Sequence, residues 1–384
     1  MKVVYLDNNA TTAVAPQVRD AMLPYLGELY GNPSSMHSFG GQVAEAVDTA
    51  REQLAALIGA DPDEIIFTAS GSEGDNAAFW SALQSQPDRR HIVTTRVEHP
   101  AVLNVCQYWE RQGYRVTYLG VDGKGRLDLE EYAATLGDDT ALVSIMFANN
   151  EVGNIYPIQK MAELAKERGI LFHTDAVQAV GKLPIDLRHL PVDMLSLSGH
   201  KIHAPKGIGA LYIRKGVRFR PLLRGGHQER GRRAGTENVP YIVGLGVAAQ
   251  LCADFMEKEQ VEVARLRDRL ENGLLERIPE SRVNGDPEHR LPNTSNISFK
   301  NVEGEAILLM LDRLGIAASS GSACTSGSLE PSHVLRAMGV PFNYAHGSIR
   351  LSLSRYTTED EIDYVVDKFP AVIETLRAIS PFKG

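Results

Sequence analysis

Two residues whose side chains can do chemistry each follow a short apolar run. Lys201 ends the polar turn after Met194–Leu197, and Asp175 comes directly after Ile170–His173. A lysine amine forms Schiff bases with carbonyl compounds. A carboxylate at the carboxyl end of a parallel strand lies where ligands bind in open α/β sheets, and it can pair with a protonated ring nitrogen. Taken alone, Lys201 also fits an ordinary surface lysine, and Asp175 fits a helix cap.

Two further turns have the composition of ligand-binding turns. Gly71 and Ser72 lie between the apolar run Glu64–Phe67 and a helical pattern. Free backbone N–H groups at such a helix start suit a phosphate. His99 follows the run His91–Thr94 and can stack on an aromatic ring or move protons near neutral pH. Considered alone, an ordinary helix start explains the Gly71–Ser72 turn better than a phosphate site does, and it explains the His99 turn equally well.

The three cysteines differ in their surroundings. Cys324 lies in a Gly/Ser-rich segment, where a thiol is expected to be exposed and mobile. Cys106 and Cys252 lie in apolar helical patterns and are expected to be packed and inert. An odd, sparse set does not form a disulfide framework and fits a reducing compartment. We therefore predict that Cys324 is the functional thiol.

The charge of the chain excludes some classes of partner. Its 384 residues carry a net charge of -8, which disfavours nucleic acid and anionic membranes. The most basic stretch, Arg214–Arg233, lacks interleaved aromatic residues and suits a small anion better than a nucleic acid. We find neither a signal peptide nor an apolar run of the ~18 residues that cross a membrane, so we expect a cytoplasmic protein.

Short apolar runs alternate with helical patterns between residues 64 and 213, which predicts βαβ units and a mainly parallel sheet. The predicted strands are Glu64–Phe67, His91–Thr94, Arg115–Leu119, Ala141–Phe147, Ile170–His173, Met194–Leu197 and Gly209–Ile213. The predicted helices before and among them are Gln17–Tyr30, Ser38–Ile58, Glu73–Ser85, Ala101–Gln112, Leu127–Leu136 and Ile158–Arg168. The residues described above then fall at successive strand ends of one sheet.

The carboxyl-terminal third has a different pattern. One long helix or a broken pair, Tyr241–Leu275, is followed by short strands and helices. Together with the length of the chain, this change predicts two domains. The large domain spans residues 15–255. The small α+β domain combines residues 1–14 with 256–384 and carries the Cys324 segment.

Each of these patterns is weak evidence when it is taken alone, but together they indicate one specific kind of site. A carbonyl-reactive lysine, a phosphate-binding turn, a carboxylate and a histidine at neighbouring strand ends predict a pyridoxal phosphate site. The chain also resembles the cysteine desulfurases of the NifS/IscS type, which are fold-type I pyridoxal phosphate enzymes of the class-V aminotransferase family. The resemblance covers essentially the whole chain. The matching segments are Tyr5–Thr12, Gly31–Ser35, Glu98–His99, Asn149–Gly153, His173–Gln178, Ser198–Lys201, Arg233–Thr236 and Ser320–Cys324.

The resemblance implies a seven-stranded, mainly parallel sheet and a role at the cofactor for each matching residue. Lys201 carries the Schiff base, and Asp175 keeps the pyridine nitrogen protonated. Gln178 bonds the ring hydroxyl, and His99 stacks on the ring. Asn150 contacts the cofactor or the substrate. The phosphate is held by Gly71, Ser72, Ser198 and His200, with Thr236 reaching it from the other subunit of a homodimer.

The resemblance also implies the reaction. Arg350 holds the carboxylate of L-cysteine, assisted by Asn32 and Asn150. Lys201 removes the Cα proton, and the thiolate of Cys324 attacks the substrate sulfur, leaving L-alanine and a persulfide on Cys324. The sulfur then passes to an iron–sulfur scaffold or another sulfur-acceptor protein. Lys201, Cys324 and His99 are the predicted catalytic residues. No resident metal is expected, although Cys324 could transiently ligate a cluster on the acceptor.

Three other functions fit parts of the pattern. A selenocysteine lyase or another fold-type I enzyme would share the cofactor residues, but an aminotransferase needs no thiol such as Cys324. A non-catalytic sulfur-transfer or assembly partner would be expected to have lost Lys201 or Asp175, and both are present. A metal hydrolase is disfavoured because the histidines and cysteines show neither His-x-x-x-His nor Cys-x-x-Cys spacing.

Overall fold

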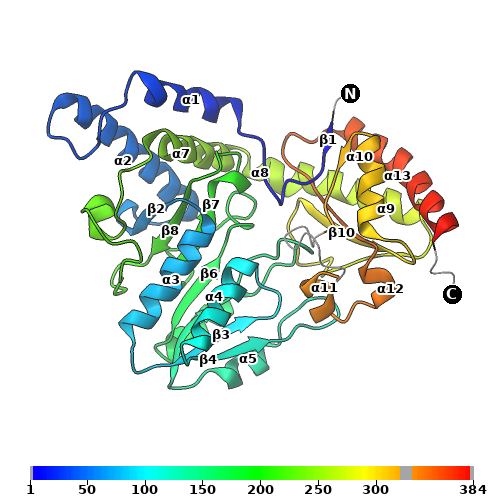
Figure 1. Ribbon diagram of the computed structural model, residues 1–384, viewed down its shortest axis with the longest axis horizontal. Coiled ribbons are helices and arrows are strands. Elements are labelled where there is room, and N and C mark those ends of the chain that lie inside the picture. The colour runs from blue at the N-terminus through cyan, green and yellow to red at the C-terminus, as the bar shows by residue number, and fades with distance from the viewer. Residues whose placement is uncertain (1–2, 321–330, 381–384) are drawn as a thin grey trace.

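The computed structural model describes residues 3–320 and 331–380. Its largest element is a seven-stranded sheet, which confirms the predicted α/β fold (Figure 1). In spatial order the strands are β2 (Ile65–Thr68), β8 (Gly209–Ile213), β7 (Met194–Ser198), β6 (Leu171–Asp175), β5 (Thr140–Ser144), β3 (His91–Thr95) and β4 (Arg115–Leu119). Within this sheet β8 runs opposite to the other six strands, so the sheet is mainly parallel.

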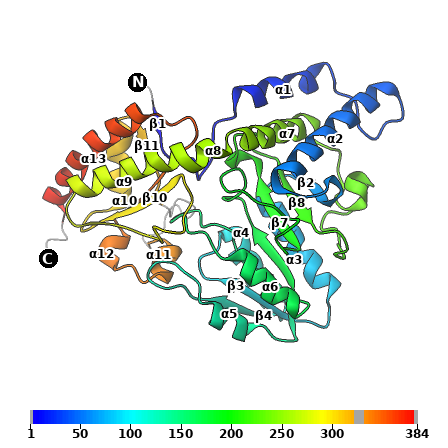
Figure 2. The same cartoon turned by 180° about the vertical axis from the view of Figure 1, so that it is seen from behind.

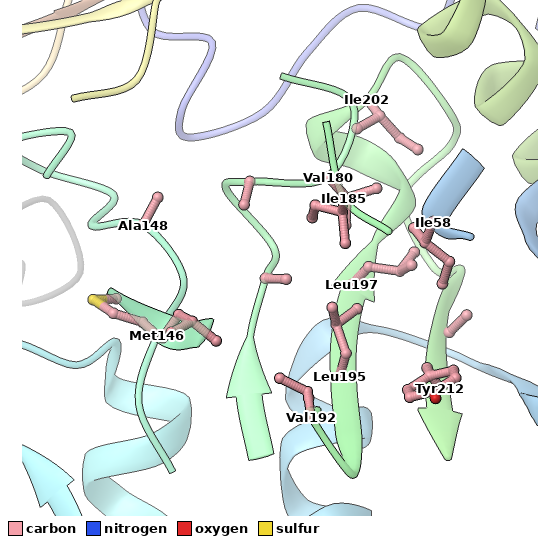
Figure 3. Packing of buried hydrophobic residues seen from close by; sticks show 14 of the residues in the cluster. Ile58, Met146, Ala148, Val180, Ile185, Val192, Leu195, Leu197, Ile202 and Tyr212 are labelled. Carbon is pink, nitrogen blue, oxygen red and sulfur yellow. The ribbon is translucent and has the colours of Figure 1, made fainter. Parts of the chain in front are cut away.

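The strands in the middle of the sheet are buried on both faces. In β7, Leu195 and Leu197 belong to the hydrophobic cluster on one face, and Met194 belongs to the cluster on the other. Successive side chains of a strand point to opposite faces of the sheet. A strand that is buried on both faces is therefore typically a nearly continuous run of apolar residues. Figure 3 shows Leu195 and Leu197 among Tyr212 of β8 and side chains of the connecting loops.

Helices cover the two faces of the sheet. The helices α3 (Gly71–Ser85) and α4 (Pro100–Arg111) lie on the face seen in Figure 1. The helix α6 (Ile158–Glu167) lies on the opposite face, seen in Figure 2. The other helices near the sheet are α1 (Pro16–Gly27), α2 (Ser38–Ile58), α5 (Leu129–Thr135) and α7 (Val239–Asp254), with 3₁₀ turns at Pro62–Glu64, Gly199–Lys201 and Gln228–Gly231.

A second hydrophobic core is built from the two ends of the chain. Val4 and Leu6 of the amino-terminal arm pack with side chains that follow residue 262. The strand β1 (Val4–Tyr5) pairs in parallel with β11 (Ile316–Ala317). The strands β12 (Ser348–Ser352), β10 (Thr294–Phe299) and β9 (Ser281–Val283) form an antiparallel sheet. The helices after α7 are α8 (Met256–Lys258), a π-helical turn (Glu259–Val263), α9 (Ala264–Arg277), α10 (Gly304–Arg313), α11 (His333–Ala337), α12 (Phe342–Ala345) and α13 (Glu359–Ile379).

The structure settles one open prediction and shortens one predicted strand. The predicted helix Tyr241–Leu275 is the broken pair, because α7 ends at Asp254 and the chain continues through α8 and the π-helical turn into α9. The predicted strand Ala141–Phe147 is shorter, and β5 ends at Ser144. The Met146 N–H points toward β3, but it donates to the buried Glu98 carboxylate (3.0 Å). The hydrogen bond that would extend β5 along β3 is therefore not formed.

No single position in the chain separates the residues of the first core from those of the second. Apart from Val4 and Leu6 of the arm, the second core starts at Val263, after Cys252 of the first core. Val334 and Leu335 of α11 nevertheless pack in the first core. The predicted domain boundaries therefore stay a prediction. In the described part of the chain, no single helix is long and apolar enough to cross a bilayer; Val239–Asp254 and Met256–Arg277 meet that length and composition only together, across a bend of 61°.

Candidate active site

The carboxyl ends of β2, β3, β5, β6 and β7 meet at one edge of the sheet, and a cavity of about 340 Å³ lies there. Neighbouring parallel strands bring the segments that follow them together, as the sequence predicts. Ten of the thirteen predicted site residues line this cavity: Gly71, Ser72, His99, Asn150, Asp175, Gln178, Ser198, His200, Lys201 and Arg350.

The other three predicted site residues lie elsewhere. Asn32 is exposed in a turn, where its Oδ1 accepts a hydrogen bond from the Ser34 N–H (2.9 Å). Thr236 is exposed and lines a separate cavity of about 210 Å³. Cys324 falls outside the described residues. The assignment of these three residues to the site stays a prediction.

Lys201 ends the 3₁₀ turn that follows β7. Its Nζ donates to the Asn9 carbonyl oxygen (2.5 Å) and the Ala10 carbonyl oxygen (2.8 Å). Burial, together with the positive charges of Lys182 and Arg350, lowers the pKa of Lys201 to about 7. A large share of the amine is therefore neutral at neutral pH, as attack on a carbonyl carbon requires.

Asp175 is the last residue of β6 and is buried. Its Oδ1 accepts from the Val177 N–H (2.9 Å), and its other oxygen has no hydrogen-bond partner among the described residues. Burial raises the pKa of Asp175 to about 6. A cationic N–H in the cavity, such as that of a protonated pyridine ring, would satisfy this oxygen and stabilise its charge.

His99 is the N-cap of α4. Its Nδ1 accepts from the Ala101 N–H (3.1 Å), so the proton of the neutral ring is on Nε2. Burial and the positive charge of Lys201 lower the pKa of His99 to about 4. The imidazole is therefore neutral at physiological pH, which suits a ring that stacks on another aromatic system.

The start of α3 forms an anion-binding end of the cavity. The Ser70 side chain caps the helix by accepting from the Glu73 N–H (3.1 Å), which leaves the N–H groups of Gly71 and Ser72 at the positive end of the helix. A Cβ at position 71 would lie 2.6 Å from Cγ2 of Val177, so any larger residue there would displace Val177. Arg233 pairs with Glu73 (2.9 Å) and offsets the one acidic charge in the first helical turn.

Arg350 closes the cavity from the second core. It lies in β12, where its side chain is 5% exposed, and its Nη2 pairs with Oδ1 of Asp7 (2.7 Å). Its Nη1 donates to the Asn150 carbonyl oxygen (3.0 Å), and its buried Nε has no hydrogen-bond partner within residues 3–320 and 331–380. The guanidinium is fixed in place and retains an N–H to offer a carboxylate.

Sequence reasoning missed the contribution of the amino-terminal arm. The Asn9 carbonyl oxygen accepts from both Lys201 Nζ and Gln178 Nε2 (2.9 Å). The run Asp7-Asn8-Asn9 was the available signal: Nδ2 of Asn8 donates to the Ser352 carbonyl oxygen (2.9 Å) and Nδ2 of Asn9 donates to the Asn150 carbonyl oxygen (3.1 Å), which hold the arm in place. These partners come from residues 141 or more positions later in the chain, a separation that local patterns do not reveal.

The donor set fits pyridoxal phosphate. The cavity combines a partly neutral amine for the aldehyde, a carboxylate oxygen without a partner for the ring nitrogen, and helix N–H groups for the phosphate. Lys201, Asp175 and the Gly71–Ser72 turn would hold the group at these three points, with His99 against the ring. Each individual role stays a prediction.

The fold and the cavity define a fold-type I pyridoxal phosphate enzyme, and comparison with known proteins confirms this prediction. A solved structure described as a NifS-like protein superposes with a TM-score of 0.92 at 40% identity, covering 98% of this chain and 100% of that chain. The cysteine desulfurase of Trichormus azollae is 65% identical, covering 100% of this chain and 96% of the relative. The cysteine desulfurase NifS of Azotobacter vinelandii is 61% identical, covering 100% and 95%.

Comparison with known protein families also assigns the chain to this class of enzyme. The aminotransferase class-V family matches residues 4–365. The chain therefore belongs to the aminotransferase class-V family, and the predicted resemblance to cysteine desulfurases of the NifS type is confirmed. The predicted dependence on pyridoxal phosphate is confirmed with it.

Proposed function

We infer that this enzyme is a cysteine desulfurase, which removes the sulfur of L-cysteine, releases L-alanine and supplies the sulfur for iron–sulfur cluster assembly. The observation that carries the inference is that Lys201, Asp175, His99 and Arg350 place an amine, a carboxylate, an imidazole and a guanidinium around one cavity. The relatives named cysteine desulfurase, at 65% and 61% identity, support cysteine as the substrate.

The residues of the cavity have separate tasks. Pyridoxal phosphate, when bound, supplies an electron sink that makes the Cα–H of an amino acid acidic. Lys201 takes up and returns that proton, since a pKa of about 7 lets the amine hold or release a proton at neutral pH. Asp175 keeps a proton on the ring nitrogen, and Arg350 orients the substrate by its carboxylate.

We propose that Cys324 receives the sulfur. Cys106 and Cys252 are buried, and burial raises the pKa of both thiols, so neither supplies a reactive thiolate. In the transfer, the Cys324 thiolate attacks Sγ of the substrate and forms a sulfur–sulfur bond. The bond between Sγ and Cβ breaks, its electron pair stays with Cβ, and a proton completes the methyl group of alanine.

The described residues on either side of the Cys324 segment support this role. Before the segment, Ser319 and Arg350 bond to each other through their backbones, with the Arg350 N–H 2.6 Å from the Ser319 carbonyl oxygen. After it, Nε2 of His333 lies 2.9 Å from the carbonyl oxygen of Glu98, the residue before His99. Five residues span at most ~17 Å when extended, so the chain from Ser319 is long enough to bring Cys324 to the cavity mouth.

We also propose a homodimer. Thr236, the residue predicted to reach the phosphate of a neighbouring subunit, does not line the cavity of Lys201. A groove of about 710 Å³ opens beside Ser72 and His99, and its lining includes Trp80 and Tyr108. A second copy seated there would cover this apolar surface and could bring its Thr236 to the first copy's phosphate site.

Mixed dimers test the shared site. Lys201→Ala chains and Thr236→Ala chains should each have little activity alone. A hybrid of the two contains one site with both native residues, so mixing the chains after dissociation should restore activity. Sedimentation should give the mass of two chains. A monomer, or no gain in activity on mixing, would contradict the shared site.

The sulfur acceptor is a second protein in this proposal, either an iron–sulfur scaffold or another sulfur carrier. We place the reaction in the cytoplasm, because a reducing compartment keeps the Cys324 thiol free to attack the substrate sulfur. The two described cysteines are free thiols, which supports this location.

Amino-acid analysis of the holoenzyme incubated with L-cysteine tests the activity itself. We expect alanine and sulfide in equal amounts when a reductant is present. The variant Lys201→Ala should form no alanine, whereas Lys206→Ala, a change at an exposed lysine five residues later, should be active. Native enzyme that forms no alanine would refute the proposed function.

A further inference from the structure

A buried lysine with no role in the reaction described above contacts a predicted cofactor residue. Lys182 is 5% exposed, and its Nζ donates to both the carbonyl oxygen and the side-chain Oε1 of Gln178 (3.1 Å each). The Gln178 Nε2 donates to the Asn9 carbonyl oxygen (2.9 Å), which also accepts from Lys201 Nζ (2.5 Å). A continuous chain of hydrogen bonds thus leads from Lys182 to the Lys201 amine.

The simplest alternative is that Lys182 only balances a buried acid. Glu259 is buried nearby, but it pairs with Arg355 (3.0 Å), and no ion pair joins the two described residues Lys182 and Glu259. The charged and titratable groups near Lys182 are Glu259, Cys252, Arg355 and Arg350, together with Lys201, His200 and His203 on the side of the cavity. Both hydrogen bonds of the ammonium go instead to Gln178.

An ammonium group can only donate hydrogen bonds, and this decides the orientation of the amide it contacts. The two ends of a glutamine amide have almost the same shape, so packing alone does not fix which end faces a ligand. With Lys182 against Oε1, the NH₂ end of Gln178 faces Asn9 and the cavity. One N–H of that group bonds to Asn9, and the second has no partner among the described residues.

We propose that Lys182 is a positioning residue for the cofactor: it holds Oε1 of Gln178, so that Nε2 donates to the ring oxygen of pyridoxal phosphate, and it adds a positive charge to the surroundings of Lys201. The proposal rests on the pyridoxal phosphate function of the cavity. The charge of Lys182 is one cause of the lowered pKa of Lys201, which is the effect a nearby cation has on an amine.

Two substitutions separate the effect of Lys182 on the orientation of the Gln178 amide from the effect of its positive charge. Lys182→Met removes the donor and the charge, whereas Lys182→Gln removes the charge and keeps an N–H donor. The control is Lys206→Met, which removes an exposed lysine near the site. The readout is the pH titration of the visible absorption band of the holoenzyme, which follows the charge on the Lys201 nitrogen, together with the rate at which the cofactor is lost on dilution.

We expect both Lys182 variants to raise the titration midpoint by about one pKa unit, because a nearby positive charge is gone. Lys182→Met should also lose the cofactor about fivefold faster, as expected for one hydrogen bond of ~1 kcal/mol, and Lys182→Gln should not. Lys206→Met should change neither quantity. A midpoint that is unchanged in Lys182→Gln, or cofactor loss that is as fast in Lys182→Gln as in Lys182→Met, would overturn the proposal.

A double substitution tests whether Lys182 acts through Gln178. In a Gln178→Leu background, Lys182→Met should no longer speed cofactor loss, because the amide it positions is absent. A full effect in that background would overturn the proposal. If Lys182→Met does not fold by circular dichroism, the Lys182→Gln titration still decides the charge effect. None of these measurements uses L-cysteine, so a failure of the desulfurase assignment would leave their outcome readable.

Discussion

Arg350 and Asp7 form an ion pair of 2.7 Å that joins β12 to the amino-terminal arm at the cavity. The arm carries the Asn9 carbonyl oxygen that accepts from Lys201. This ion pair therefore fixes the position of Arg350, which is predicted to hold the substrate, and the position of the arm that contacts Lys201. The guanidinium is in position before substrate arrives, which reduces the entropy lost on binding.

We predict that Arg350→Lys raises the KM for L-cysteine about 10- to 100-fold, because a lysine cannot form the two parallel hydrogen bonds of a guanidinium with a carboxylate. The visible absorption band without substrate should be unchanged, since Arg350 holds the substrate and not the cofactor. Steady-state kinetics of alanine formation measure the effect. A lower kcat with an unchanged KM would show that Arg350 does not bind the carboxylate.

The buried ion pair between Arg51 and Glu229 should matter for stability. Its atoms lie 2.8 Å apart, and the side chains are 9% and 3% exposed. We predict that Arg51→Met lowers the free energy of unfolding by about 3–5 kcal/mol, because it leaves Glu229 as an uncompensated buried charge. The matched control is Arg115→Met at the exposed Arg115–Asp139 pair, which should cost less than about 1 kcal/mol. Denaturant unfolding compares them, and equal losses would contradict the argument.

The lowered pKa of Lys201 predicts how cofactor uptake depends on pH. The amine is protonated below its pKa of about 7 and neutral above it. Only the neutral amine attacks the aldehyde, so uptake of pyridoxal phosphate by the apoenzyme should speed up as the pH rises through 7 and then level off. Stopped-flow absorbance measures this rate. A rate that keeps rising toward pH 10 would indicate a lysine with an ordinary pKa.

The sequence was sufficient to predict the site where a residue with a reactive side chain directly follows a predicted strand. Asp175 and Lys201 were predicted to lie together because each follows a buried run, and parallel strands bring such residues to one edge. The central strands of the large sheet were recognisable for the same reason, since every residue of β5 and β7 is buried. The ends of the strands depend on tertiary contacts: the Met146 N–H donates to the buried Glu98 carboxylate, so β5 ends at Ser144.

The sequence was insufficient where a contact depends on distant segments. Lys182 looks like any surface lysine after a glycine, and its burial depends on the packing of α7 and the π-helical turn behind it. The pairing of β1 with β11 joins residues more than 300 positions apart. Asn32 and Thr236 were assigned to the site by resemblance alone, and neither lines its cavity in a single chain.

The most direct measurement of the central claim is mass spectrometry of the protein after a single turnover with L-cysteine, combined with alanine analysis. The peptide that contains Cys324 should gain the mass of one sulfur atom, and one equivalent of alanine should form. Cys324→Ser should keep the visible absorption band of the bound cofactor but release no sulfide. Full-rate desulfuration by Cys324→Ser, or sulfur found on Cys106 or Cys252, would contradict the claim.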